Sequence, residues 1–191
     1  MIPANAGFED IKNIIKSYNN PEHRLNKNRN NFCSNISRAD NNGIRKTIID
    51  LLNPVETVKC AGSFLKNTND LQEKFGDNKI EYLKTFKFNI CPENSDTNGY
   101  VTEKLFEAII SGTIPIYWGS ENKPDPMIIN QDAVLFFDPE NPQLLFDKVN
   151  LLWNDEKVYE EFCRIKPFQE NAAEVIWEWL NSLESKIKST L

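Results

Sequence analysis

The sequence predicts an α/β fold in which a parallel sheet carries helices on both faces. Apolar runs rich in β-branched and aromatic residues, typical of buried strands, occupy residues 86–91 and 113–118. Segments with apolar side chains at helical spacing accompany them, at residues 44–52 and 101–111. Strands that alternate with helices at such intervals indicate βαβ units. Right-handed crossovers then bring the loops after the strands to one edge of the sheet, where folds of this kind bind ligands.

The other elements follow from the same spacing rules. Gly112 directly follows the helix expected at residues 101–111, where a helix C-cap residue belongs. Residues 19–31 are polar and rich in Asn, Lys and Arg, so we expect a loop or linker there, with a solvated His23. The remaining expected elements are strands at residues 32–37, 55–60 and 133–137, and helices at residues 8–20, 80–86, 144–153, 158–165 and 172–187.

Size and charge exclude several classes of protein. The 191 residues, of which 40% are hydrophobic, suffice for one ordinary domain core. The 28 acidic residues outnumber the 22 basic ones, and the net charge of −6 argues against binding to nucleic acid or to an anionic membrane surface. A local basic site for a phosphate stays open. Because no apolar run reaches the ~20 residues that a membrane span needs, no transmembrane segment is predicted.

The potential metal ligands are few and scattered. The cysteines Cys33, Cys60, Cys91 and Cys163 contain no C-x-x-C pair, and His23 is the single histidine, so a zinc site is disfavoured. We expect buried free thiols, which suit a reducing compartment. The chain also lacks an Asp-x-Asp pair, so no metal ion is predicted to be required.

The most informative segment spans residues 86–119, which reads as strand, polar loop, helix and strand. A helix N-terminus offers unpaired N–H groups and a partial positive charge, which suit an anion and above all a diphosphate. Lys104 lies in the first helical turn, where its charge opposes the helix dipole unless a phosphate offsets it. Glu103 is favourably placed against the dipole and is also a candidate helix cap. By themselves, Glu103 and Lys104 fit a solvated helix surface better than a binding site.

The flanking residues carry a resemblance. Residues 100–104 read Tyr-Val-Thr-Glu-Lys and residues 112–119 read Gly-Thr-Ile-Pro-Ile-Tyr-Trp-Gly. Both strings resemble, without a gap, the signature of the α-1,3/1,4-fucosyltransferases, glycosyltransferase family 10. Phe32-Cys33 followed by Ile44-Arg45 also keeps the spacing of bacterial members. The resemblance extends over about residues 30–165.

The resemblance implies a fold and a domain division. The chain looks like the Rossmann-like, C-terminal half of a two-domain GT-B glycosyltransferase, which binds the donor GDP-fucose and requires no cofactor. We expect an N-terminal helix and polar linker at residues 1–30, the nucleotide-sugar-binding domain at 31–165 and a C-terminal helix at 166–191. The glycan acceptor and the general base would belong to an N-terminal domain that this chain lacks. In a bacterium the protein would be cytoplasmic, and peripheral association with a membrane stays open. In a eukaryote it would lie in the Golgi lumen.

Site residues follow from the matching positions. The family's lysine and arginine at the donor diphosphate fall on Lys104 and Arg45, with Arg38 as a rival for the phosphate role. Glu103 would face the ribose or fucose ring and stabilise positive charge developing there. The full set expected at the donor is Arg45, Asn94, Tyr100, Val101, Thr102, Glu103 and Lys104. The chain departs from the family at Pro92, where relatives have Phe before Glu-Asn, so an aromatic wall of the pocket is missing or replaced.

The implied reaction is an inverting transfer of L-fucose to N-acetylglucosamine-containing glycans, as in Lewis-antigen synthesis and protein glycosylation. Two alternatives stay open. In the first, the chain is a free-standing domain without catalytic activity that binds a nucleotide sugar or a partner protein. In the second, it is a transferase domain that uses a different nucleotide sugar.

Overall fold

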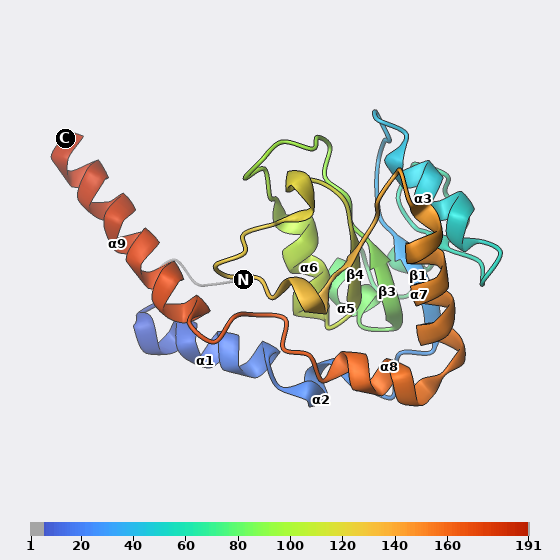
Figure 1. The fold of residues 1–191 in the computed structure, drawn as a ribbon, viewed down its shortest axis with the longest axis horizontal. Helices are drawn as coiled ribbons and strands as arrows, with labels where there is room; N and C mark the ends of the chain where they lie inside the picture. Colours follow the sequence, from blue (N-terminus) through green and yellow to red (C-terminus); the bar gives the residue numbers. More distant parts are fainter. Residues whose placement is uncertain (1–5, 191) are drawn as a thin grey trace.

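The computed structural model describes residues 6–190, and within them five strands form one parallel sheet (Figure 1). The strand order is β2-β1-β3-β4-β5, and every pairing is parallel. This confirms the α/β fold with a parallel sheet. The strands are β1 Asn31–Asn35, β2 Lys59–Cys60, β3 Phe86–Ile90, β4 Ile114–Tyr117 and β5 Leu135–Phe136.

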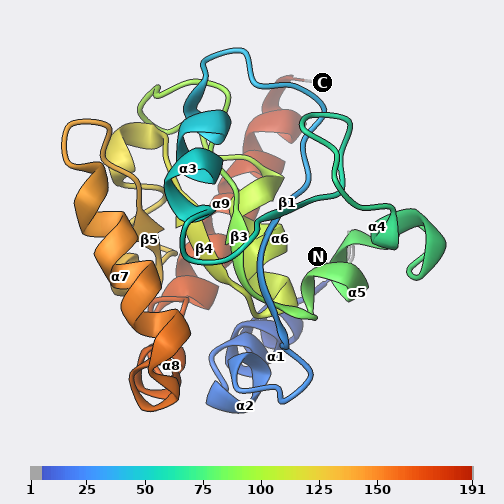
Figure 2. The same ribbon diagram turned by 90° about the vertical axis from the view of Figure 1, so that its right-hand side faces the viewer.

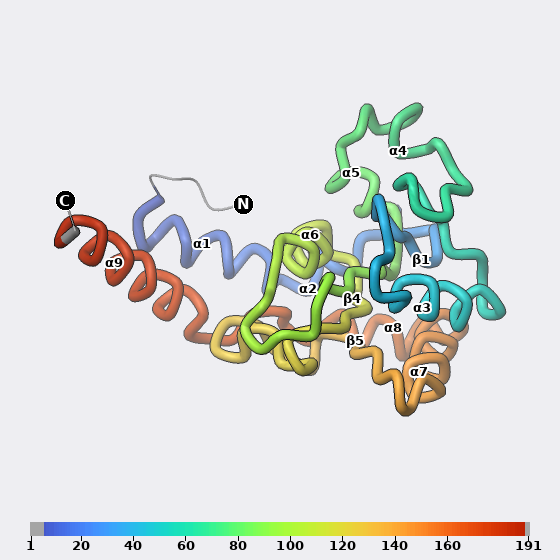
Figure 3. Tube along the Cα trace, turned by 90° about the horizontal axis from the view of Figure 1, so that it is seen from above, coloured from blue at the N-terminus to red at the C-terminus, as the bar shows by residue number. Residues whose placement is uncertain are grey.

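Helices cover both faces of the sheet, as expected (Figures 1 and 2). Apolar side chains of α3, α7 and α8 form one core cluster with the strands, and those of α1, α6 and α9 form a second. Figure 3 shows α4 and α5 on one side of the molecule and α7 on the other. The helices are α1 Phe8–Tyr18, α2 Pro21–Arg24, α3 Ile44–Leu52, α4 Asp70–Glu73, α5 Lys79–Leu83, α6 Glu103–Ser111, α7 Pro142–Asn154, α8 Glu156–Cys163 and α9 Ala172–Thr190.

The strand order creates a point where ligands bind in such sheets. After β1 the chain first adds β2 on one side and then β3 on the other, so the order reverses between β1 and β3. Loops that leave these two strands at their carboxyl ends diverge and open a crevice. The register pairs Asn35 with Ile90, so both strands end at the same level.

Several expected elements are shorter than the pattern indicated, among them the strand expected at residues 133–137, which is formed only by Leu135–Phe136. For two others the hydrogen bonds show the cause. The strand expected at residues 55–60 is formed only by Lys59–Cys60, because Asn53 Oδ1 accepts a hydrogen bond from the Val58 N–H and holds the preceding residues in a turn. The helix expected from residue 101 begins at Glu103, because Thr102 is extended and its N–H bonds to a side chain rather than entering the helix. Gly112 has a φ of 77° at the end of α6, as a C-cap residue should.

The polar stretch at residues 19–31 is not a free loop or linker, which corrects the expectation. It contains α2 and two arginines that are almost fully buried, Arg24 and Arg29. Arg29 donates to the carbonyls of Arg24, His23, Phe86 and Ser111. Composition alone marks such residues as solvent-exposed, whereas a guanidinium with five donors can be buried when carbonyl groups surround it. The domain division at residues 30 and 165 stays a prediction.

His23 is also not simply solvated. Its ring Nε2 lies 3.2 Å from the Ile109 carbonyl, and the side chain is half-buried beside Tyr18. Burial, with Arg29 and Arg24 nearby, lowers its pKa below the usual 6.5. The ring is therefore held in its neutral form.

The folded state should accordingly lose stability as the pH falls from about 7.5 to about 5.5. In that range the unfolded chain takes up a proton at His23 that the folded chain resists, so the free energy of unfolding rises with pH, by at most about 1.4 kcal/mol per pH unit for one proton. Urea unfolding across this range measures the slope. Because His23 is the single histidine, His23→Gln should flatten it, and an unchanged slope in the variant would contradict the assignment.

The four cysteines are buried and free, as expected. Within the described residues, no helix combines the length and hydrophobicity required to cross a bilayer.

Candidate functional site

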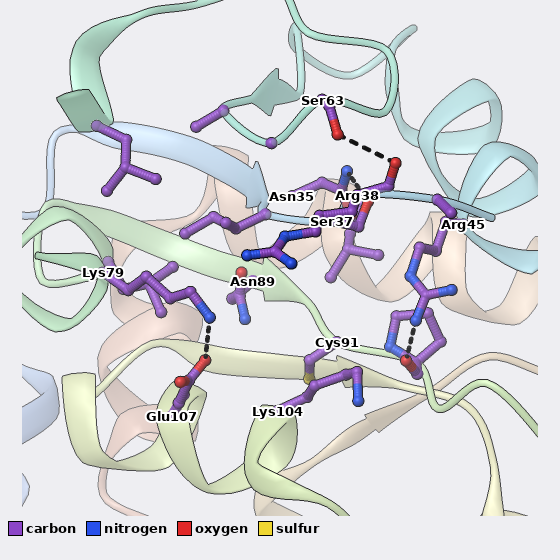
Figure 4. Close-up of a pocket in the computed structure, with 18 of the residues that line it drawn as sticks. Asn35, Ser37, Arg38, Arg45, Ser63, Lys79, Asn89, Cys91, Lys104 and Glu107 are labelled. Carbon is purple, nitrogen blue, oxygen red and sulfur yellow. Dashed lines mark hydrogen bonds and ion pairs between the residues drawn. The ribbon is translucent and has the colours of Figure 1, made fainter. Parts of the chain in front are cut away.

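A cleft of about 840 Å³ opens at the carboxyl ends of β1, β2 and β3, between α6 and the α4–α5 segment (Figure 4). Its floor includes Asn35, Asn89 and Ile90, at or next to the ends of β1 and β3. Its rim is formed by the loops that follow β1 and β2. The cleft therefore occupies the switch point of the sheet.

The cleft is locally basic in an acidic chain. Five basic side chains line it against three acidic ones, whereas the whole chain has a net charge of −6. A local excess of cations at the mouth of a concave site attracts an anionic ligand. The basic residues are Arg38, Arg45, Lys66, Lys79 and Lys104, and the acidic ones are Asp77, Glu103 and Glu107.

Lys104 is positioned by a buried carboxylate. Glu93, which follows β3 and is 0% exposed, accepts hydrogen bonds from the Thr102 N–H at 2.7 Å and the Thr102 hydroxyl at 2.7 Å. The Lys104 ammonium donates to Glu93 at 3.3 Å and to the Thr102 hydroxyl at 2.7 Å. Glu93 therefore ties the start of α6 to the end of β3 and fixes the lysine at the wall of the cleft, where its side chain stays 25% exposed.

The tight approach of another loop explains a glycine of the signature. Gly119 follows β4, has a φ of 127°, and a side chain there would place Cβ 2.8 Å from Glu93 Cβ. That separation is shorter than real Cβ contacts allow. The glycine therefore lets the loop after β4 close over Glu93 and exclude water from it.

Arg45 reaches the cleft from the first turn of α3. Its Nη2 donates to the Pro92 carbonyl at 2.9 Å and to Asn94 Oδ1 at 3.0 Å, and Nη1 lies 3.7 Å from Asp40. These contacts fasten the loop after β3 to α3. The Arg45 side chain is only 5% exposed and Nη1 faces Asp40. Within the part of the chain that the structure describes, Nε and Nη1 make no hydrogen bond, so their hydrogen-bonding capacity is left for a ligand that reaches the edge of this side chain.

The residues proposed from sequence divide into two groups. Arg45, Asn94, Glu103 and Lys104 line one cleft, together with the rival Arg38. The other three, Tyr100, Val101 and Thr102, lie on the loop before α6 and do not line the cleft. Thr102 acts through Lys104 and Glu93, as described above.

Sequence reasoning missed three features of the cleft. It treated Glu93 only as part of a segment that departs from the signature, although an acidic residue three positions after the end of a buried strand was a signal for a buried contact. It did not single out Asn89 on the floor, or the pair formed by Lys79 and Glu107. Those two residues are 28 positions apart in the chain, and no local pattern links them.

A match to a protein family over most of the chain shows which family this is. Residues 25–184 of the 191 match the C-terminal domain of glycosyltransferase family 10 (fucosyltransferase). The chain belongs to glycosyltransferase family 10. The resemblance carried by the residues of the signature is thereby confirmed.

Two α-(1,3)-fucosyltransferases and a solved structure are similar to parts of this chain. The α-(1,3)-fucosyltransferase FucT of Helicobacter pylori is 46% identical over 89 residues, which are 47% of this chain and 18% of that protein. The α-(1,3)-fucosyltransferase B of Drosophila melanogaster is 34% identical over 113 residues, 55% of this chain and 26% of that protein. A crystal structure of an α1,3-fucosyltransferase with GDP-fucose has a TM-score of 0.64 and 26% identity, over 95% of this chain and 54% of that one. This family 10 chain thus spans about half or less of these relatives.

Proposed function

We propose that this chain is the donor-binding half of an inverting α-1,3-fucosyltransferase of GT-B architecture and holds GDP-fucose in the cleft. One observation carries the proposal: Lys104 and Arg45 belong to separate βα junctions and yet line the same cleft at the switch point. Two cations beside a helix start suit a diphosphate. A relative of known structure that covers 95% of this chain was crystallised with GDP-fucose.

In this proposal the diphosphate lies between Lys104 and Arg45. The Lys104 ammonium and the unbonded Nε and Nη1 of Arg45 donate to phosphate oxygens while the bond between the anomeric carbon and the phosphate breaks. These donors are already held in place, so they stabilise the negative charge of the departing GDP without rearrangement. Glu103, whose side chain is 63% exposed at the cleft, faces the ribose or fucose ring and stabilises positive charge on it.

The acceptor completes the reaction from the other side. A hydroxyl of an N-acetylglucosamine-containing glycan attacks the anomeric carbon from the face opposite GDP, which inverts its configuration. The hydroxyl proton passes to a general base, which this proposal assigns to an acceptor-binding domain beyond the described residues. No metal ion or further cofactor takes part.

Calorimetric titration with GDP, GDP-fucose, GDP-mannose and UDP-galactose tests the proposal. We expect both GDP and GDP-fucose to bind more tightly than UDP-galactose. Preference for UDP-galactose would instead support a transferase domain for another nucleotide sugar. Absence of binding by every nucleotide would favour a domain that contacts a partner protein without catalysis.

Lys104→Ala should weaken GDP binding roughly tenfold to a hundredfold, since a charge-assisted hydrogen bond contributes about 1.5–3 kcal/mol. Calorimetry gives the dissociation constant, and thermal unfolding shows whether the fold is kept. Lys157→Ala is the matched control, because Lys157 is an exposed lysine of α8 that does not line the cleft. Equal dissociation constants for wild type and Lys104→Ala would remove the basis of the phosphate assignment.

A further inference from the structure

A charged pair lies at one end of the cleft, away from Arg45 (Figure 4). Lys79 is the first residue of α5, and Glu107 lies one turn after Glu103 on α6. The Lys79 ammonium and the Glu107 carboxylate are 3.6 Å apart, which is too long for a hydrogen bond. Neither group makes a hydrogen bond within residues 6–190. The pair therefore presents an ammonium and a carboxylate side by side, attracted to each other but with their hydrogen-bonding capacity left for a ligand, and both line the cleft.

The pair and Arg45 lie at opposite ends of the cleft. Figure 4 shows Arg45 toward one end, Lys104 and Asn89 nearer the middle, and Lys79 with Glu107 at the other end. A diphosphate at the first end directs the nucleoside past Asn89. Asn89 lines the cleft there, and its side-chain oxygen accepts a hydrogen bond from the Ser34 hydroxyl. Within the described residues its amide NH2 group makes no hydrogen bond, so it can donate to a polar group of the nucleoside.

The chemistry of the pair matches one base better than others. Guanine presents two adjacent donors, N1–H and the N2 amino group, next to the acceptor O6. A carboxylate has two oxygens and accepts both donors side by side, and an ammonium donates to O6. Uracil offers a single N–H between two carbonyls, and adenine has an acceptor where guanine has N1–H. We propose that Glu107 and Lys79 read the guanine of the donor nucleotide and so determine base specificity, an inference that rests on the proposed function.

Another carboxylate lines the same end of the cleft but is less suited to this role. Asp77 accepts a hydrogen bond from Gln72 at 2.9 Å and is exposed to solvent. The Glu107 side chain is 30% exposed and is set on a regular helix, which fixes its direction. Asp77 therefore serves as the matched control for a carboxylate of the same cleft.

The test compares GDP with inosine diphosphate, which lacks only the N2 amino group, and with UDP, by calorimetry. Wild type should bind GDP roughly tenfold more tightly than inosine diphosphate, because one charge-assisted hydrogen bond is lost. Glu107→Ala should weaken GDP binding by roughly tenfold to a hundredfold and abolish the difference between GDP and inosine diphosphate. Alanine favours helix, so α6 should be kept. Asp77→Ala should leave both affinities and their ratio unchanged.

The outcomes separate the two proposals. If wild type binds GDP and Glu107→Ala retains the preference for GDP over inosine diphosphate, the base-reading role is overturned while the donor assignment stands. An equal loss of affinity for both nucleotides in Glu107→Ala, with their ratio kept, assigns Glu107 to the ribose and likewise overturns it. If wild type binds neither nucleotide, the proposed function itself fails.

Discussion

Gly62→Ala should destabilise the protein by about 3 kcal/mol, the upper end of the usual cost of overpacking. Gly62 lies in the loop after β2, against the loop after β1. An added Cβ would lie 2.0 Å from the Ser37 carbonyl oxygen and 2.6 Å from the Ser37 nitrogen. Both are backbone atoms, so no side-chain rotation relieves the clash. The two loops that form the rim of the cleft would have to separate, and GDP binding should fall with stability.

Urea unfolding measures this change. Gly99→Ala is the control, because Gly99 has a φ of 73° but no neighbour within 4 Å of an added Cβ. It should cost only the ~1–2 kcal/mol of a left-handed backbone conformation. Equal losses in the two variants would show that the loops accommodate the methyl group and that the close approach has no energetic consequence.

Glu93→Ala is expected to cost about 3 kcal/mol of stability and to weaken GDP binding as well, since breaking a buried ion pair leaves its partners unsatisfied. The Thr102 N–H and hydroxyl would lose their acceptor, and Lys104 would lose the carboxylate that positions it. The lysine is 25% exposed, so water offsets part of the loss on its side. The first turn of α6 should fray.

Two measurements separate this effect from simple loss of charge. Urea unfolding gives the stability, and hydrogen exchange at the Thr102 amide reports the freed N–H. Glu103→Ala is the control, because its carboxylate also lies near Lys104, at 3.5 Å, but is 63% exposed. Exposed ion pairs contribute about 0–1 kcal/mol, so this variant should change the free energy of unfolding by about 1 kcal/mol or less. It is a control for stability alone, because Glu103 is assigned to the donor site. Slow exchange at Thr102 in Glu93→Ala would argue against the tether.

Much of the fold was predictable because its signals are local. The apolar strand at residues 86–91 and the helix that ends at Gly112 depend on periodicity and on a glycine cap. The length of β2 was overestimated from the alternating pattern at residues 55–60. The Val58 N–H donates a hydrogen bond to the Asn53 side chain, and the spacing of apolar residues does not reveal this contact. The buried Arg24 and Arg29 were missed for a similar reason, since their partners are carbonyls from distant elements.

The amino-acid sequence by itself determined that strands alternate with helices and that Arg45 and Lys104 each lie in the first turn of a helix. These properties depend on neighbours along the chain. Only the tertiary structure decided that the two cations share a cleft, that Glu93 holds Lys104, and that Lys79 meets Glu107. The physical reason is the strand order. Because β3 pairs with β1, the helices α3, α5 and α6 lie around the same carboxyl edge of the sheet. Charged side chains that are far apart in the sequence therefore line one cleft.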